Sequence, residues 1–502
     1  MKGIIRFFFL FLLVGGFLGT QAVYGQGGAT GAISGTVLDV NGGSVADADV
    51  QIIDARTDLL SRKLSTGAEG SFVATLLPPG NYHVVVNKSG FAEAKASGIE
   101  VRVTETTRMT INLKPGTVTE TVEISAQVAT VETTNAATGQ SIGENTVRSL
   151  PLATQNFQQL LTLSAGAQSD LNNSTSLGRG DVRIIVNGQR EDNNNYQIEG
   201  IGANDYNVAE LTNTPLPNPD VIQEFKVQTS LYDATQGRNG GGNINAILKT
   251  GTKQYHGDAY EFFRNTALNA NDFFLNSQRS ARPVLRQNIF GGSLGGPLVS
   301  DKFGFFFVNY QGTRQTSGLS PGTFISTTIP SLPAMRDANT LASVFSSPAT
   351  ASCPGLTINP NQIDPVVLAL LNAKSAQFGG DANGHLIPSV GTNPGISYIS
   401  GTCQPAVNFA PFAISRPGTF NDDQFTTTWT KEFGKGSDKI TADFFFSNSK
   451  TLAPFGAGGL QASLGGSIAA SDLNFPYTLP VSDRFFGLTE THLFTPTIVN
   501  AL

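Results

Sequence analysis

The chain has 502 residues, of which 14% are charged and 55 are glycine, whereas ordinary soluble domains carry about 25% charged residues. Its 34 phenylalanines and low charge argue against an intrinsically disordered protein, because such chains are rich in charge and poor in aromatic residues. Lys and Arg number 32 against 38 Asp and Glu, so the net charge of −6 leaves no surplus of cations for a nucleic-acid partner.

Residues 1–25 have the pattern of a secretory signal. Lys2 and Arg6 form a basic start, Phe7–Leu18 is a run of 12 apolar residues, and small residues suitable for cleavage follow. The run is shorter than the ~20 apolar residues of a spanning helix, and an uncleaved anchor is the alternative. No later stretch approaches 18 apolar residues, so insertion into a membrane would require a β-barrel.

Residues 28–114 consist of short alternating runs such as Ala32–Val37 and Tyr82–Val86, separated by turns at Asn41–Gly43 and Pro78–Gly80. Strands at this spacing predict a small β-sandwich. The run ISGTVLD…NGGSVADADVQI…GSFVATLLPPGNYHVVVNKSGF resembles the carboxypeptidase-regulatory-like domain, a transthyretin-like sandwich.

The resemblance to a peptidase-associated domain does not predict peptidase chemistry. A zinc site needs histidine and carboxylate ligands at fixed spacing. No HxxE or HExxH motif occurs, and the histidines are more than 100 residues apart: His83, His256, His385 and His492. We therefore expect no catalytic residue, no metal and no cofactor, so that the protein is not an enzyme.

Residues 115–127 form a linker rich in Thr, Val and Glu. Within it, Thr119–Ser125 alternates apolar Val122 and Ile124 with polar residues, which predicts a short extended segment. Such a segment can add as an edge strand to the sheet of a partner, with main-chain hydrogen bonds supplying the affinity. An ordinary linker strand is the alternative.

Residues 128–252 predict a small α/β domain. Phe157, Leu160, Leu161 and Ser164 have helical spacing, and Gly166 ends the helix. Strands are expected at Val182–Val186 and Tyr196–Ile201, and Val221–Val227 and Gly237–Asn245 then lead to Ala246–Gly251.

The run LPLATQNFQQLLTLSAG…RIIVNGQREDNNNYQIEGI…VIQEFKVQTS resembles the plug domain of TonB-dependent outer-membrane receptors, in the Oar-like branch, which carries the regulatory-like sandwich in front. The resemblance implies a plug lodged in a barrel and a preceding TonB box that binds the TonB–ExbB–ExbD complex. By position, the box corresponds to Glu120, Thr121, Val122, Glu123, Ile124 and Ser125.

Two short strings in this region invite other interpretations. Arg179–Asp181 is an RGD tripeptide, but three residues recur by chance and an adhesive role is not expected. Gly237–Gly242 (GRNGGG) lacks the following Gly-Lys-Ser/Thr of a phosphate-binding loop, so a tight, closely packed turn is the better interpretation.

Residues 253–502 predict antiparallel strands joined alternately by short turns and long loops, as in outer-membrane barrels. One connection, 316–420, is expected to be a loop of about a hundred residues, which a soluble β-sandwich, the alternative, would rarely tolerate. The strands are expected at Asp258–Arg264, Gln287–Leu298, Phe303–Gln311, Asp423–Phe433, Asp438–Ser449, Asp483–Phe494 and Ile498–Leu502.

The fold class expected is mainly β: an N-terminal sandwich, a small α/β plug and the first six to seven strands of a transmembrane antiparallel barrel. Barrels that hold a plug use about 22 strands, so we expect a fragment of a longer receptor. The cell outer membrane and its lipid are the expected surroundings. Cys353 and Cys403 could close a disulfide after export, and two free thiols are the alternative.

The expected function is energy-coupled uptake of a nutrient, and a surface adhesin or assembly protein that does not transport is the alternative. Because the polar segments are neutral rather than basic, the composition favours a neutral ligand such as an oligosaccharide over a highly anionic complex, although a siderophore-like small molecule stays open. The candidate ligand-binding residues are Asn193, Asn194, Asn195, Asn204, Asp205 and Tyr206.

Overall fold

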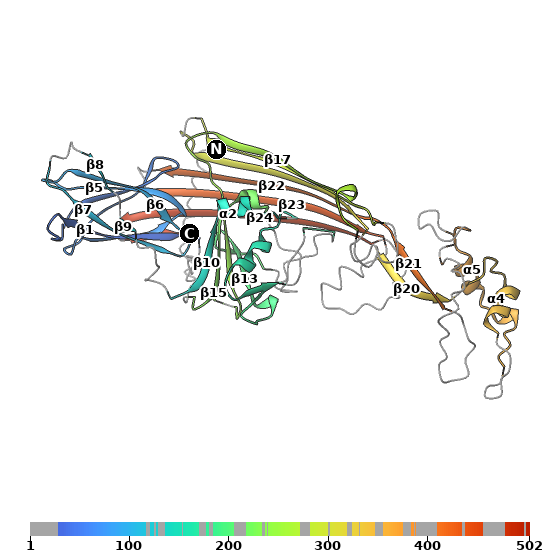
Figure 1. Cartoon of the computed structure of the whole chain (residues 1–502). Helices are drawn as coiled ribbons and strands as arrows, with labels where there is room; N and C mark the ends of the chain where they lie inside the picture. Colours follow the sequence, from blue (N-terminus) through green and yellow to red (C-terminus); the bar gives the residue numbers. More distant parts are fainter. Residues whose placement is uncertain are drawn as a thin grey trace, which may run out of the picture.

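The computed structural model of the chain is built mainly from β-strands in three successive parts (Figure 1), here named the sandwich, the middle domain and the large sheet. No helix among the described residues is both long and apolar enough to cross a membrane. The described residues are 29–116, 121–124, 127–128, 136–152, 154–169, 177–179, 184–204, 217–232, 236–237, 239–271, 282–299, 302–318, 324–330, 332–346, 355–374, 383–385, 387, 409–433, 437–454, 477–495 and 498–501.

The sandwich consists of two sheets, with strand orders β3-β2-β5-β6-β8 and β4-β1-β7-β9. Alternate residues of each strand point into one core, as Ile33 and Val37 do in β1, which confirms the predicted β-sandwich. Its strands are β1 (Gly31–Asp39), β2 (Asp49–Asp54), β3 (Leu59–Ser65), β4 (Ser71–Leu77), β5 (Gly80–Asn87), β6 (Glu93–Val101), β7 (Thr106–Leu113), β8 (Thr121–Ile124) and β9 (Gln127–Val128).

The middle domain has a five-stranded mixed sheet of order β10-β15-β16-β13-β14. The helix predicted around Phe157 is a 3₁₀ helix, which begins where the side chain of Asn156 accepts a hydrogen bond from Gln158 N. The elements are β10 (Thr138–Gly143), α2 (Glu144–Ser149), η1 (Phe157–Leu163), β11 (Ala167–Ser169), β12 (Ile184–Val186), η2 (Glu191–Asn193), β13 (Asn195–Ile198), β14 (Ile201–Gly202), η4 (Pro219–Val221), β15 (Ile222–Ser230) and β16 (Asn243–Leu248).

The large sheet has seven strands in the order β17-β18-β19-β22-β23-β24-β25, and all neighbours are antiparallel. Five of its strands have 13 to 19 residues, more than the 9–11 with which a tilted strand crosses a bilayer. The elements are β17 (His256–Asn265), η5 (Thr266–Leu268), β18 (Leu285–Pro297), β19 (Phe305–Ser317), β22 (Gly418–Phe433), β23 (Asp438–Ala453), β24 (Tyr477–Thr495) and β25 (Ile498–Ala501).

The expectation that 316–420 is a single loop of about a hundred residues was wrong. The segment contains a hairpin of β20 and β21, and two short helices whose N-cap residues are Asp337 and Asp364. In Figure 1 these elements extend beyond one end of the large sheet. They are β20 (Phe324–Pro330), α4 (Ala338–Phe345), η6 (Pro360–Gln362), α5 (Pro365–Asn372) and β21 (Phe409–Ser415).

The middle domain packs against one face of the large sheet. Its apolar core includes Phe225 and continues into Phe307, Phe445 and Phe485, which come from β19, β23 and β24. Neighbouring residues point the other way: Phe486 is 67% exposed. The predicted alternation along these strands is therefore confirmed, and the sheet has a face that covers the middle domain and an opposite, outer face.

Candidate functional site

The linker after the sandwich folds back and adds one edge strand to each of its sheets. Thr121–Ile124, the described part of the predicted TonB box, forms β8 and pairs in parallel with the first half of β6, from Glu93 opposite Thr121 to Ala96 opposite Ile124. Two residues further on, β9 pairs with β7. Glu120 and Ser125 lie outside the described residues. The extended conformation predicted for this segment is confirmed, and the strand it pairs with belongs to the same chain.

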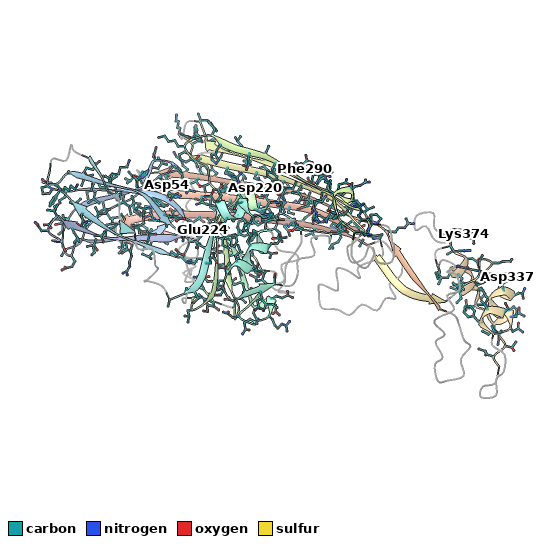
Figure 2. The ribbon with its side chains drawn as sticks, viewed as in Figure 1. Asp54, Asp220, Glu224, Phe290, Asp337 and Lys374 are labelled. Atoms are coloured by element: carbon teal, nitrogen blue, oxygen red, sulfur yellow. The ribbon has the colours of Figure 1, made fainter. Side chains whose placement is uncertain are left out.

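The other end of the sandwich touches β15 of the middle domain through its β6–β7 turn. Val103 N donates a hydrogen bond to Glu224 Oε1 at 3.3 Å, and Lys226 Nζ is 2.8 Å from Glu105 Oε1. Both partners from β15 are at most 7% exposed. Figure 2 shows Glu224 where the sandwich meets the middle domain.

Burial raises the pKa of Glu224 to about 7, and the nearby carboxylate of Glu105 adds to this rise. Hydrogen bonds from the Ser141 hydroxyl and the Val103 N–H act in the opposite direction but do not outweigh burial. The contact between sandwich and middle domain therefore contains a carboxyl group that changes its charge near neutral pH.

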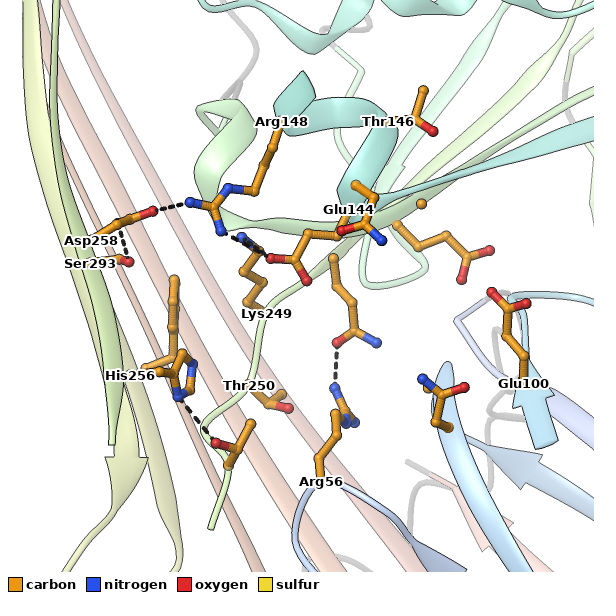
Figure 3. A pocket seen from close by; sticks show the side chains of 18 of the residues that line it. Arg56, Glu100, Glu144, Thr146, Arg148, Lys249, Thr250, His256, Asp258 and Ser293 are labelled. Carbon is orange, nitrogen blue, oxygen red and sulfur yellow. Dashed lines mark hydrogen bonds and ion pairs between the residues drawn. The ribbon is translucent and has the colours of Figure 1, made fainter. Parts of the chain in front are cut away.

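A polar cavity of about 720 Å³ lies where the sandwich, the middle domain and the large sheet meet (Figure 3). Arg148 of α2 is 2.6 Å from Asp258 of β17 and 3.5 Å from Glu144, and Lys249 is 2.9 Å from the same Glu144. From the sandwich, Arg56 Nη1 donates to the side-chain oxygen of Gln223 at 2.7 Å.

The cavity is lined by charges of both signs that are paired with one another, so it lacks the one-sided charge of a site for an ion or phosphate. Because its partners come from three parts of the chain, a relative movement of these parts would exchange or break these pairs. The arrangement suits a joint between domains better than a binding pocket. The sequence did not predict this cavity, because its lining comes from segments as far apart as Arg56 and Asp258.

Arg179, the first residue of the RGD string, connects the middle domain to the large sheet. Its Nε and Nη2 are 2.9 and 3.0 Å from the two carboxylate oxygens of Asp422 in β22, and it also contacts Ser447. The side chain of Asp422 is 1% exposed. Gly180 and Asp181 lie outside the described residues. An arginine held in this way is occupied inside the protein, and the expectation that the RGD string is not adhesive stays a prediction.

Two of the asparagines predicted to bind ligand have their side chains engaged within the fold. Asn194 donates to Ile184 O and accepts from Gly242 N, and Asn204 accepts from Tyr196 N and donates to Asn194 O. Asn193 and Asn195 also bond neighbouring amides, of Gln189 and Asn243, at 3.3 and 3.2 Å. Asp205 and Tyr206 lie outside the described residues. A ligand role for these six residues stays a prediction.

The glycine-rich string next to these asparagines forms a close approach of two backbone segments. A Cβ atom on Gly241 would lie 2.4 Å from Asn194 Oδ1 and 2.9 Å from Asn193 O. Only glycine fits at that distance, as expected from the interpretation of 237–242 as a closely packed turn.

Three side chains on the outer face of the large sheet could hold a metal ion. Asp438, Glu490 and His492 can place their ligand atoms within 4.8 Å of one another, and His492 Nδ1 is 2.5 Å from Asp438 Oδ1. Two carboxylates and an imidazole form a donor set that zinc accepts. Sequence spacing did not reveal the group, because strand pairing places His492 opposite Asp438. Cys353 and Cys403 lie outside the described residues.

Comparison with known proteins gives two family matches. Residues 247–502 match the outer membrane beta barrel domain, and residues 32–114 match the carboxypeptidase regulatory-like domain. The chain is 27% identical over 327 residues to the TonB-dependent transporter Oar of Myxococcus xanthus, covering 61% of this chain and 29% of that protein. The chain therefore spans less than a third of the length of this relative.

Similar solved structures include the outer membrane transporter YddB from Escherichia coli, with a TM-score of 0.37 and 13% identity over 71% of this chain and 37% of that one. Another is the siderophore receptor PirA from Acinetobacter baumannii, with a TM-score of 0.34 and 13% identity over 72% and 46%. Similarity at this level adds no support to a functional assignment.

Proposed function

Because the chain belongs to the outer membrane beta barrel domain family, which places it in the outer membrane, and is homologous to Oar, we propose that it is a TonB-dependent receptor for energy-coupled uptake. The large sheet is then part of the wall of a transmembrane β-barrel. The middle domain, within residues 128–252, is its plug. The curated relative is a transporter, and we propose no catalytic activity.

The observation that carries this proposal is the packing of the middle domain on one face of the large sheet. Phe307, Phe445 and Phe485 bury their side chains against it, while Phe486 and Leu488 on the outer face are 67% and 58% exposed. The outer face, with its exposed large apolar residues, could contact lipid. The opposite face, which packs on the middle domain, could line the lumen of a barrel that holds a plug. A soluble β-sandwich is not expected to expose large apolar residues along one face in this way.

Energy coupling is assigned to the linker. We propose that Glu120–Ser125 is the TonB box and that the TonB–ExbB–ExbD complex in the inner membrane acts on it. Thr121–Ile124 already has the extended backbone that strand addition needs. The ligand is a small molecule or an oligosaccharide, met by the outer loops and by the region of Asn193–Asn195 and Asn204–Tyr206.

A binding measurement with the periplasmic domain of TonB from the same organism tests the assignment. Deleting Thr119–Ser125 should abolish binding of the detergent-purified protein, because the deletion removes the backbone groups that would pair. A deletion of equal length at Val131–Ala137, just after the linker, is the matched control and should bind like the unmodified chain. Equal binding by both deletion variants would contradict the box assignment.

In the cells that make this protein, the same two deletion variants allow uptake and ligand binding to be measured separately. A panel of oligosaccharides and ferric siderophores as sole carbon or iron source identifies the ligand through the growth defect of a strain lacking the gene. The Thr119–Ser125 deletion should then keep binding of that compound to whole cells and lose growth on it. Growth at the normal rate would contradict a TonB-dependent mechanism.

One observation favours a second function, that of a surface adhesin or assembly protein. Helix α5, in the insertion beyond the large sheet, exposes Val366, Val367 and Leu370 by 75%, 47% and 53%. Exposed apolar residues gathered on one short helix mark an interaction surface. Adhesion would not require TonB. This function would therefore be favoured over transport if cells lacking TonB still attach, and if Val366→Ser together with Leu370→Ser reduces that attachment.

A further inference from the structure

The linker strand β8 lies at the edge of its sheet and pairs with a neighbouring strand, β6, on one side only among the described residues. Successive residues of a strand direct their backbone N–H and C=O groups to opposite sides, so the ladder with β6 engages only one side. Within the described part of the chain, the sheet ends at β8. The other row of backbone groups is therefore the next pairing position of the sandwich.

The place of β8 within the sandwich suits a partner in the periplasm. It pairs with the first residues of β6, whereas the turn after the last residues of β6 contacts the middle domain through Val103. In Figure 1, β8 is accordingly at the end of the sandwich away from the middle domain. An approaching strand would not have to pass the middle domain or the large sheet.

The charge of the segment narrows the kind of partner. No Lys or Arg occurs from Pro115 to Val147, whereas Glu120 and Glu123 fall within the predicted box. The backbone register pairs Glu123 with Lys95 of β6. Because the segment is acidic, basic residues on the partner strand would favour its pairing with the free edge of β8.

We propose that the sandwich is a platform that presents the TonB box: the partner adds its strand to the free edge of β8 and extends the sheet, without displacing β8 from β6. This inference rests on the proposed function and gives the regulatory-like domain a role in it. Since the sandwich fixes the backbone of β8 in advance, the partner does not bear the entropic cost of ordering that strand. The opposite arrangement, in which the sandwich hides the box, predicts that β8 must first leave β6.

A reversible crosslink distinguishes presentation from hiding. Lys95→Cys with Glu123→Cys, in a chain with Cys353→Ser and Cys403→Ser, places two thiols at directly paired positions, where a disulfide can form. If β8 is presented, the oxidised protein should bind the periplasmic domain of TonB with a Kd within about threefold of the reduced protein. If oxidation weakens binding by about tenfold or more and dithiothreitol restores it, the platform is overturned. Each single cysteine variant controls for the loss of the native side chain.

A peptide provides a second, independent measurement. The segment Thr117–Val128 alone should bind the same TonB domain at least about tenfold more weakly than the full chain, because the free peptide must be ordered on binding. Equal or tighter binding by the peptide would overturn the platform. Lack of any binding by the unmodified chain would overturn the proposed function and this inference together, whereas loss of binding only in the crosslinked protein overturns the platform alone.

Discussion

At the scale of single residues, the contact of Arg179 with Asp422 joins the middle domain to the large sheet through a buried carboxylate. The carboxylate is 1% exposed and receives two hydrogen bonds from the guanidinium, so its charge is balanced by one residue more than 200 positions away. Burying a lone charge is costly, while a buried pair replaced as a unit loses little. The free energy of unfolding should therefore fall when one partner is removed and largely recover when both are replaced.

Arg179→Met should lower the free energy of unfolding by about 3–5 kcal/mol, because it leaves Asp422 buried and unpaired. Adding Asp422→Asn should recover most of that loss. Urea unfolding of the detergent-purified protein measures both. Arg190→Met is the matched control: Arg190 is 83% exposed, pairs with Asp192 at the surface, and its replacement should change little. Equal losses for Arg179→Met and Arg190→Met would contradict the buried pair.

Glu224 predicts a pH dependence of the contact between sandwich and middle domain. Its pKa is about 7 in the folded chain and about 4.5 as the ordinary value, so the folded state binds the additional proton between these values. Stability is therefore highest below about pH 4.5 for this group and falls as the pH rises towards 7. Glu224→Gln should remove this dependence and stabilise the protein at pH 8.

Thermal unfolding of the Glu224→Gln variant and the unmodified chain, compared from pH 5 to pH 8, checks this sign. The exposed Glu69→Gln is the control and should follow the unmodified chain at every pH. If the unfolding temperatures of Glu224→Gln and of the unmodified chain change with pH by the same amount, Glu224 does not titrate in this range.

At the scale of elements, the strands could be predicted because alternation is a local signal. Asp438–Ser449 and Asp483–Phe494 were expected as strands with the faces that the structure has, and the structure extends both. Helix α5 was missed, because a run of six apolar residues, Val366–Leu371, between segments rich in Pro and Gly resembles loop and strand as much as helix. Contacts such as Arg179–Asp422 could not be predicted, since they depend on which segments the fold brings together.

The two faces of β23 and β24 predict different responses to the same substitution. Phe445→Ala should cost about 3–5 kcal/mol of unfolding free energy, because it leaves a cavity between the large sheet and the middle domain. Phe486→Ala, on the neighbouring strand but 67% exposed, should cost much less in detergent. Urea unfolding of the two variants gives the comparison, and equal costs would contradict the assignment of faces.

At the scale of the whole molecule, the three parts are predictable as separate units but their contacts are not. Gly and Pro turns delimit the sandwich, and the long alternating strands delimit the large sheet. The cavity around Arg148 arises only when these units are assembled. The Asp438–Glu490–His492 group and the strand pairing of Thr121–Ile124 each lie within one unit, and depend on which strands become neighbours there.

If the sandwich lies in the periplasm, where TonB would act on β8, the insertion with α5 at the other end of the large sheet faces the outside of the cell. In a chain with Cys353→Ser and Cys403→Ser, Val366→Cys in α5 should react with a membrane-impermeant maleimide on intact cells. Lys63→Cys in the sandwich, also well exposed, should react only after the outer membrane has been permeabilised. Labelling of Lys63→Cys on intact cells would contradict a periplasmic sandwich.

The length of the strands has a further consequence for encounters at the cell surface. Strand β24 has 19 residues and is about 63 Å long at ~3.3 Å per residue. At a tilt of about 40° its height is roughly 48 Å, nearly twice the ~25 Å apolar band of an outer-membrane barrel. The hairpin of β20 and β21 lengthens the structure further at one end, so α4 and α5 would stand clear of the lipid headgroups, where large or polymer-bound molecules arrive first.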